Sequence, residues 1–333
     1  MSSATAILAE TAAPKQVRQE HLSPNQQAWR RFKRNRMAVA SSIFVLCLVG
    51  LVLVWPLLSN PALAAPKPVT YSPTALTDNP FSPPDAQHWF GTDANGRDIL
   101  SRIFFGARIS LLVGVVGAAV SLVIGVLWGA TAGYFGGRLD ERMMRFVDIL
   151  YALPSIVFVI VIITTLETYF KGWLDRVDRN FGTEIGARTR MVFLFVGLGA
   201  VSWLTMARIV RGQVLTLRKR QFVDASRSLG AGEARILFRH ILPNVLGVII
   251  VYVTLIIPSI ILYESFLSYL GLGVQPPQAS LGSLIAEGAA QINPIRTYWW
   301  MIAYPAGLLA ITLLALNFVG DGLRDAWDPR TKE

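Results

Sequence analysis

Charged residues are scarce in this sequence. Lys, Arg, Asp and Glu make up 16% of the 333 residues, and hydrophobic residues make up 53%, whereas an ordinary soluble domain has about 25% charged residues. This shortage excludes an ordinary soluble domain and favours a chain that crosses a membrane several times. The net charge of +10 is then a sign of membrane topology and of contact with anionic lipid, and we do not interpret it as nucleic-acid binding.

Cysteine and histidine are also rare. Cys47 is the only cysteine, and His21, His88 and His240 lie in three separate polar segments, so we expect no disulfide framework, no metal site and no catalytic dyad inside the membrane. The sequence also lacks a GxxxxGK(S/T) phosphate-binding loop. We therefore expect neither a cofactor nor a catalytic residue, and if ATP drives this protein, another subunit supplies the ATPase site.

Six hydrophobic segments are long enough to cross a bilayer, because a membrane-spanning helix needs about 17 to 25 mostly apolar residues. They lie at about residues 37–58, 109–134, 149–166, 191–206, 245–266 and 299–318. The sequence therefore predicts an all-α integral membrane protein with six transmembrane helices.

Basic residues give the orientation of these helices, since Lys and Arg near span ends stay on the cytoplasmic side. If both termini are cytoplasmic, the inner segments contain 21 of the 31 Lys and Arg residues and the outer segments contain 10. Acidic residues divide into 11 inside and 10 outside, so the whole net charge lies on the inner face. We expect both termini to be cytoplasmic.

The N-terminal region resembles a secretory signal, with basic residues ahead of an apolar run. That run has about 22 residues, which exceeds the hydrophobic region of a signal peptide, so we expect an uncleaved first span. Trp29, Phe32 and Met37 share a side among basic residues, which predicts an amphipathic helix on the inner leaflet.

The most informative segment is a polar, glycine-punctuated stretch between the fourth and fifth apolar runs. It reads DASRSLGAGEARILFRHILPN and begins at Asp224. Gly230 follows six residues later, and Leu242 and Pro243 follow about a dozen residues after that. This spacing predicts a helix from about Val223 with Gly230 at its C′ position, then a second helix and a proline stop.

The spacing resembles the EAA loop of permease subunits in binding-protein-dependent ABC importers, the helical hairpin that docks on the ATPase. Further motifs similar to the oligopeptide, dipeptide and nickel permeases of this family are FGTD at 90–93, GRD at 96–98, GARISLLVG at 106–114, ESFLSYLGLG at 264–273 and NFVGDGLRDAWDP at 317–329. The segment VSWL at 201–204 is most similar to the C-type subunit of the oligopeptide permease. The resemblance covers about residues 24–330.

The resemblance also implies which residues of the loop contact the ATPase. They are Asp224, Ala225, Ser226, Gly230, Ala231, Leu242 and Pro243. Asp224 stands where the family pattern has Glu, and Ser226 stands where it has Ala. Asp keeps the charge and Ser keeps the small size, so we expect docking to survive both departures. His240 stands where many members have an apolar residue.

The family resemblance implies a type I ABC importer permease fold, in the bacterial inner (plasma) membrane. This subunit would pair with a second homologous permease to form the pore, and membrane lipid would surround both. Two cytoplasmic ATP-binding subunits would bind below, and an extracytoplasmic binding protein would deliver substrate. ATP binding would draw the ATPases together, and the loop would pass that motion to the spans. Peptides, oligopeptides first, are the implied substrate, with dipeptides, nickel chelates and peptide antibiotics as alternatives.

The predicted organisation of the chain follows from these assignments. It comprises a disordered cytoplasmic tail (1–22), an interfacial helix (23–36), the first transmembrane helix (37–58), an extracytoplasmic segment (59–103), a core transmembrane domain (104–320) with the coupling loop (208–244), and a cytoplasmic tail (321–333). Residues 167–190 form an outer excursion that is unusually long for the family and has no clear apolar period; we expect it to be solvated.

Small residues predict how one span packs. Gly125, Gly129 and Gly133 repeat at four-residue spacing along the second span. Such a stripe allows another helix to approach closely. Close packing is the expected role, with a hinge as the alternative.

Prolines and one carboxylate mark candidate gate residues. Pro154, Pro258 and Pro305 fall within the third, fifth and sixth predicted spans, where a missing N–H permits a kink; static shaping of the bundle is the alternative to a kink at a gate. Glu264 is the only carboxylate well inside a span, about 28 Å along the fifth helix from its start. An ionisable residue at that depth indicates a functional role in the pore or gate, and a cap on a neighbouring helix is the alternative.

Two other protein classes fit the sequence less well. A secondary transporter would need inverted repeats and charged groups near the membrane midplane, and the sequence has no convincing internal repeat and no carboxylate at mid-span. A membrane-embedded enzyme would need a nucleophile and a base inside the bilayer, yet no histidine lies in a predicted span.

Overall fold

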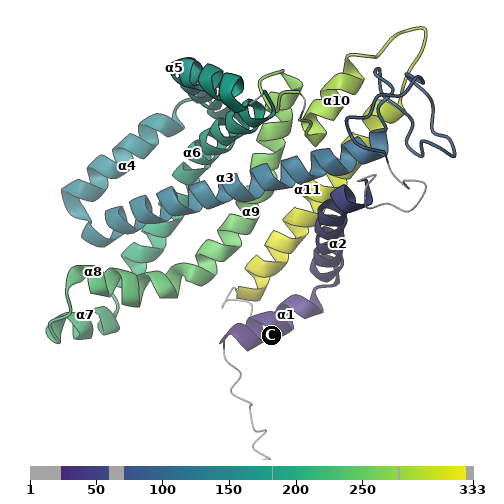
Figure 1. Ribbon diagram of the computed structural model, residues 1–333. Coiled ribbons are helices and arrows are strands. Elements are labelled where there is room, and N and C mark those ends of the chain that lie inside the picture. Colours follow the sequence, from purple (N-terminus) through teal and green to yellow (C-terminus); the bar gives the residue numbers. More distant parts are fainter. Residues whose placement is uncertain (1–23, 60–70, 182, 277, 328–333) are drawn as a thin grey trace, which may run out of the picture.

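The computed structural model describes residues 24–59, 71–181, 183–276 and 278–327, and most of them are helical (Figure 1). The elements in chain order are α1 (Pro24–Arg34), α2 (Arg36–Leu58), α3 (Ile99–Phe135), α4 (Gly137–Tyr151), α5 (Ser155–Phe181), α6 (Thr183–Arg218), α7 (Gln221–Ser228), α8 (Glu233–Ile236), the π-helical turn η1 (Leu237–Ile241), α9 (Leu242–Tyr269), α10 (Leu281–Ala289) and α11 (Trp300–Trp327). The predicted tail 1–22 lies outside the described residues.

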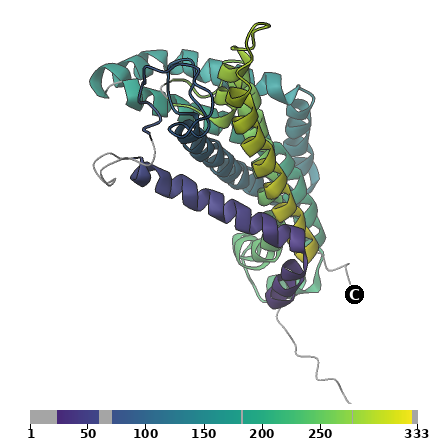
Figure 2. The ribbon, with the colours of Figure 1, turned by 90° about the vertical axis from the view of Figure 1, so that its right-hand side faces the viewer.

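Six helices among the described residues are long and apolar enough to cross a membrane, as the sequence predicts. They are α2, α3, the Ser155–Trp173 part of α5, the Met191–Arg218 part of α6, the continuous helix Glu233–Tyr269 and α11. Ends of α3, α6 and α9 gather near α7 and α8, which we call the hairpin end, whereas α10 and the loop before α3 lie at the opposite end (Figure 1). Figure 2 shows α1 beside the ends of α2 and α11.

The crossing of α3 and α6 forms the centre of the bundle. A Cβ atom added to Gly125 would lie 2.6 Å from the Cβ of Met206, and one added to Gly133 would lie 2.8 Å from the carbonyl oxygen of Arg211. Real side chains do not approach so closely, so only glycine allows this helix distance. The predicted close packing along this stripe is confirmed, and its partner is α6.

The predicted third span, 149–166, is wrong at its start. Residues 152–154 separate α4 from α5, and the span begins at Ser155. Pro154 therefore precedes the helix and does not kink it, and its carbonyl oxygen accepts the N–H of Phe158 at 3.0 Å. The residue before a proline avoids helical backbone angles, which explains the break.

The last residues of the predicted outer segment 59–103 are already helical, because α3 begins at Ile99. Asp98 caps this helix, and its carboxylate accepts the backbone N–H of Ser101 at 2.8 Å. Hydropathy detects only the apolar part of this helix, from about residue 109. The cap at Asp98 starts the helix ten residues before that point.

Two predicted polar segments at the hairpin end are also partly helical. The span of α6 continues to Arg218, so the predicted loop 208–244 begins as helix, and α11 continues to Trp327 inside the predicted tail 321–333. A helix keeps its backbone bonds beyond the bilayer, so hydropathy alone does not locate its end.

The predicted excursion 167–190 is helical as well. The helix α5 runs to Phe181 and α6 begins at Thr183. Phe170 and Phe193 stack with ring centroids 5.5 Å apart, which joins the two helices. Most other side chains of this segment lie outside the described residues.

The predicted amphipathic helix exists as α1, and the rings of Trp29 and Phe32 stack with centroids 5.8 Å apart, but Met37 does not belong to this helix. Phe32 is 7% exposed and packs in a cluster with Ala326 of α11. Trp29 and Met37 remain 56% and 57% exposed. Asn35 ends α1 by capping α2, so Met37 belongs to another helix and cannot share a face with α1.

Candidate functional site

The predicted glycine turn is present between α7 and α8. Gly230 has a φ of +80°, and its N–H donates to the carbonyl of Arg227 at 2.9 Å, while the N–H of Ala231 donates to the carbonyl of Ser226 at 3.1 Å. These two bonds form a Schellman motif with Gly230 at C′, which confirms the predicted position. The turn therefore closes a short, well-defined hairpin, residues 221–241.

The apolar face of this hairpin is anchored on the bundle. One buried cluster contains Val223, Ile236, Leu237 and Ile241 of the hairpin with Tyr134 of α3 and Val210 and Val214 of α6. Val223, Ile236 and Ile241 have no exposed surface. The hairpin is therefore packed against the ends of α3 and α6 through close-packed buried side chains.

Polar contacts reinforce the anchor. Tyr134 donates its hydroxyl hydrogen to Glu233, the first residue of α8, and Arg227 of α7 donates two hydrogen bonds of 3.2 Å to the same carboxylate. Hydrogen bonding to Glu233 raises the pKa of the Arg227 guanidinium. Nearby, Arg211 of α6 binds Asp140 of α4 through two bonds of 2.5 and 2.6 Å.

The opposite face of the hairpin is open. Of the predicted contact residues, Asp224, Ala225, Gly230 and Pro243 are exposed, and Ser226, Ala231 and Leu242 are half-buried. Sequence reasoning missed the exposed large apolar side chains of the hairpin: Leu229 at the turn is 88% exposed, Phe238 is 58% exposed and Phe222 is 39% exposed. Large apolar side chains held on a rigid polar hairpin are typical of a protein docking surface.

The predicted proline stop at Leu242 and Pro243 is wrong. Pro243 lies in the first turn of α9, and the helix runs on from α8 through η1. The N–H of Leu242 donates to the carbonyl of Leu237, a π-type bond that spans five residues. This wider turn lets the helix continue through a residue that has no N–H to donate.

Two of the predicted gate residues, Glu264 and Pro258, are buried in α9. Glu264 has no exposed surface; its carboxylate accepts hydrogen bonds from Ser268 at 2.6 Å and from Ser110 of α3 at 3.2 Å. Ser110 in turn accepts the N–H of Leu281, the first residue of α10, at 3.2 Å. Pro258 is buried too. This geometry favours the alternative role for Glu264, which ties α3, α9 and the start of α10 together.

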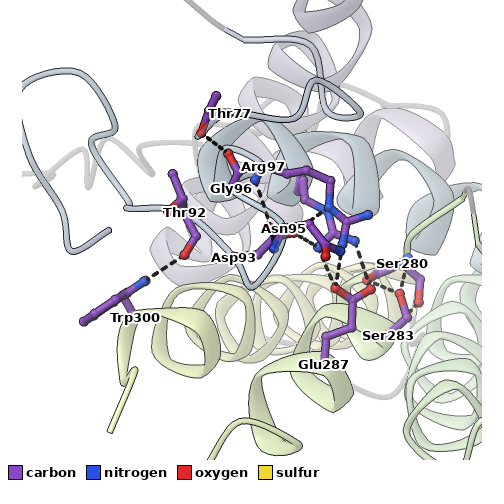
Figure 3. Close-up of polar contacts among 11 residues, drawn as sticks. Thr77, Thr92, Asp93, Asn95, Gly96, Arg97, Ser280, Ser283, Glu287 and Trp300 are labelled. Carbon is purple, nitrogen blue, oxygen red and sulfur yellow. Dashed lines mark hydrogen bonds and ion pairs between the residues drawn. The ribbon is translucent and has the colours of Figure 1, made fainter. Parts of the chain in front are cut away.

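A second polar network lies at the α10 end (Figure 3). Arg102 of α3 donates to Asp93 at 2.6 Å and makes two bonds to Glu287 of α10, at 2.6 and 2.9 Å. Arg97 binds Asp93 at 2.6 Å and Glu287 at 3.3 Å. Asp93 and Arg102 have only 2% and 5% of their side chains exposed. These ion pairs join the FGTD loop and α3 to α10.

Sequence reasoning did not assign Tyr134, Glu233, Arg102 or Glu287 to any site. The FGTD and GRD motifs could have indicated the second network, because they place the opposite charges of Asp93 and Arg97 four residues apart. No local signal joins Tyr134 to Glu233. Among the described residues, no group of three or more His, Cys, Asp or Glu side chains could hold a metal ion.

The chain matches known protein families and known proteins over most of its length. Residues 121–333 match the family described as binding-protein-dependent transport system inner membrane component, and residues 23–84 match the N-terminal TM domain of oligopeptide transport permease C. The chain is 44% identical over 308 residues to the oligopeptide transport system permease protein OppC of Escherichia coli strain K12, which covers 92% of this chain and 91% of the relative. OppC of Haemophilus influenzae is 42% identical, with 92% and 89% covered. The dipeptide transport system permease protein DppC of Bacillus subtilis is 40% identical, with 95% and 89% covered.

Among solved structures, the chain resembles one described as an inward facing conformation of the MetNI methionine ABC transporter. The TM-score is 0.50 at 18% sequence identity, and the similarity covers 66% of this chain and 94% of the other. At this identity the likeness shows a shared fold alone, and it confirms the predicted importer permease fold.

Proposed function

Because the chain belongs to the family of binding-protein-dependent transport system inner membrane components, we propose that it forms one half of the translocation path of an ABC importer for oligopeptides. It is a multi-pass protein of the inner membrane. The oligopeptide assignment is supported by relatives at 42% and 44% identity that are named for that substrate class.

The anchored hairpin is the observation that carries the proposed mechanism. The Schellman turn at Gly230 fixes its shape, and the buried contacts of Val223 and Ile236 fix it to α3 and α6. A partner that pushes the exposed tip at Leu229 would therefore move the bundle and not merely bend a loop. We infer that the segment from Asp224 to Pro243 docks in a cleft of the ATPase and transmits its motion.

The proposal also includes the other subunits of the importer. The chain has no phosphate-binding loop, so two ATP-binding subunits supply the energy from the cytoplasm. A second homologous permease completes the pore, and a binding protein delivers substrate on the other side. In this arrangement the hairpin end and both termini are cytoplasmic, and the network around Glu287 is extracytoplasmic.

Reconstitution of the complete complex tests this proposal. Proteoliposomes that contain this chain, the second permease and both ATPases should import a labelled pentapeptide only when ATP and the binding protein are present. Substituting an ATPase variant that binds but does not hydrolyse ATP is the matched control. Peptide-independent ATP hydrolysis without uptake, in an assembled complex, would contradict the proposal.

A dipeptide substrate is the second candidate, because the dipeptide permease of Bacillus subtilis is 40% identical over 95% of this chain. Uptake of labelled alanine peptides of two to six residues distinguishes a dipeptide importer from an oligopeptide importer. Preference for two residues would favour the dipeptide assignment, and efficient uptake of four or more would favour oligopeptides.

A further inference from the structure

A cavity of about 390 Å³ opens between α5, α6 and α9. It is separate from the hairpin and from the cluster around Glu264. Seven of its fourteen lining residues carry a hydroxyl group, and none of the fourteen is charged. The hydroxyl residues are Tyr151 and Ser155 at the α4–α5 junction, Ser202 and Thr205 on α6, and Tyr252, Ser259 and Tyr263 on α9. We call this surface the hydroxyl wall.

The wall follows one face of α9. Tyr252, Ile256, Ser259 and Tyr263 line the cavity, and their spacing of four, three and four residues places them on the same side of the helix. Glu264 is turned toward α3 and α10 instead. From Tyr252 to Tyr263 the face extends about 16 Å at the rise of a helix, which is the length of about five residues of extended peptide.

Several of these hydroxyl groups lack a partner within the protein. Thr205 and the hydroxyl of Tyr151 are 2.8 Å apart. Among the described residues, the hydroxyl groups of Ser155, Ser259 and Tyr263 have no hydrogen-bond partner, and Ser155 and Ser259 are exposed. An unsatisfied hydroxyl is costly against lipid, so polar residues at this depth face water or a polar ligand.

The charged groups beside the cavity neutralise each other. The Arg208 guanidinium lies 3.9 Å from the centre of the Tyr151 ring and binds Asp148 at 2.7 Å. Neither of these two charged residues lines the cavity. The wall itself is therefore uncharged and can both donate and accept hydrogen bonds.

We propose that the hydroxyl wall is part of the peptide path and binds the main chain of the peptide. Hydroxyl groups can pair with both the N–H and the C=O of any peptide unit, and the tyrosine rings offer apolar contact to any side chain. Without a charge, the wall accepts acidic and basic peptides alike. This inference rests on the proposed function, and it adds which residues contact the peptide and why side-chain charge is not selected there.

Introducing a charge at Ser259 tests the inference. In proteoliposomes with the complete complex, Ser259→Asp should lower uptake of Ala-Glu-Ala relative to Ala-Lys-Ala by about 25-fold, because repulsion of Glu and attraction of Lys by one close charge in water each contribute a factor of about five. Ser259→Lys should shift the same ratio in the opposite direction. Ser259→Ala removes the hydroxyl without adding charge and should leave the ratio unchanged. Ser42→Asp, on α2 and away from the cavity, is the control for a charge elsewhere in the bundle.

A chemical measurement covers the case in which the charged variants do not assemble. With Cys47→Ser as background, the thiol introduced by Ser259→Cys should react with a water-soluble methanethiosulfonate, and transported peptide should slow that reaction. An unreactive thiol would mean that the wall faces lipid or the second permease and would overturn the inference. So would unchanged uptake ratios in assembled Asp and Lys variants. Absence of peptide uptake by the wild-type complex would overturn the proposed function instead.

Discussion

Tyr134, at the last turn of α3, donates its hydroxyl hydrogen to the carboxylate of Glu233 at the start of α8, 99 residues away. The bond fastens the hairpin to the helix that crosses α6 along the glycine stripe. The hairpin is thus joined to α3 by a polar contact as well as by its buried apolar side chains. The first prediction concerns this bond.

Replacing Tyr134 with Phe should weaken coupling while the complex still assembles. The ring remains in its apolar cluster, but Glu233 loses a donor, a loss of about 1 kcal/mol for a partly exposed bond. The expected result is fewer peptides imported per ATP hydrolysed. Tyr169→Phe is the control, since Tyr169 is 85% exposed. Equal coupling ratios in both variants would show that the bond does not contribute.

Gly230→Asp should abolish uptake while the permease still inserts in the membrane. A Cβ at Gly230 meets no atom within 4 Å, so the cost comes from its φ of +80°, about 1–2 kcal/mol for other residues. The added carboxylate also changes the docking face. Gly230→Ala should show a milder defect from the backbone alone. Gly232→Ala is the matched control, because Gly232 has a φ of −65°. The measurements are uptake and copurification with the ATPase; normal uptake by the Asp variant would exclude the hairpin as the coupling element.

Glu264 should matter more for stability than for transport. Glu264→Gln keeps the shape and can still pair with Ser268 and Ser110, so we expect a small fall in melting temperature and unchanged uptake per assembled complex. Glu264→Leu leaves the buried hydroxyl groups without their acceptor and should lower the melting temperature much more, at about 1–3 kcal/mol for each unpaired group. Altered uptake by the Gln variant at unchanged melting temperature would restore a role in the gate.

Arg102→Ala should destabilise the α10 end. It leaves Asp93 buried with one partner fewer, and removal of one member of a buried ion pair costs about 3–5 kcal/mol. Arg208→Ala is the control, since its partner Asp148 has 63% of its side chain exposed and such pairs contribute about 0–1 kcal/mol. Thermal unfolding in detergent compares the two. Similar melting temperatures for both variants would mean that the network around Glu287 is not a structural tie.

Topology can be tested with a single thiol. In a Cys47→Ser background, the thiol introduced by Ser226→Cys should resist an impermeant maleimide in intact cells and react after the membrane is opened. The reason is the excess of Lys and Arg on the hairpin side. Labelling in intact cells would reverse the proposed orientation.

The sequence alone determined the fold class and the number of spans. Long apolar runs with few charges enter the bilayer. They form helices there, because a helix satisfies the hydrogen bonds of its own backbone. The turn at Gly230 was also predictable, because its signal is local: a residue type that tolerates positive φ after a short helix. Helix ends were less predictable. Asp98 starts α3 well before the apolar run begins, and the π turn before Pro243 carries a helix through a residue that normally ends one.

Only the tertiary structure decided which distant residues meet. Tyr134 and Glu233 are far apart in the chain, as are Arg102 and Glu287, and no periodicity relates their positions. Glu264 shows the same limit: its depth in the helix was readable, but whether it faced a pore or the serine groups of α3 and α9 depends on how the helices rotate against each other. Hydropathy fixes which segments enter the membrane, whereas side-chain packing fixes the rotation of each helix, and that rotation places the hydroxyl wall on one face of α9 and Glu264 on another.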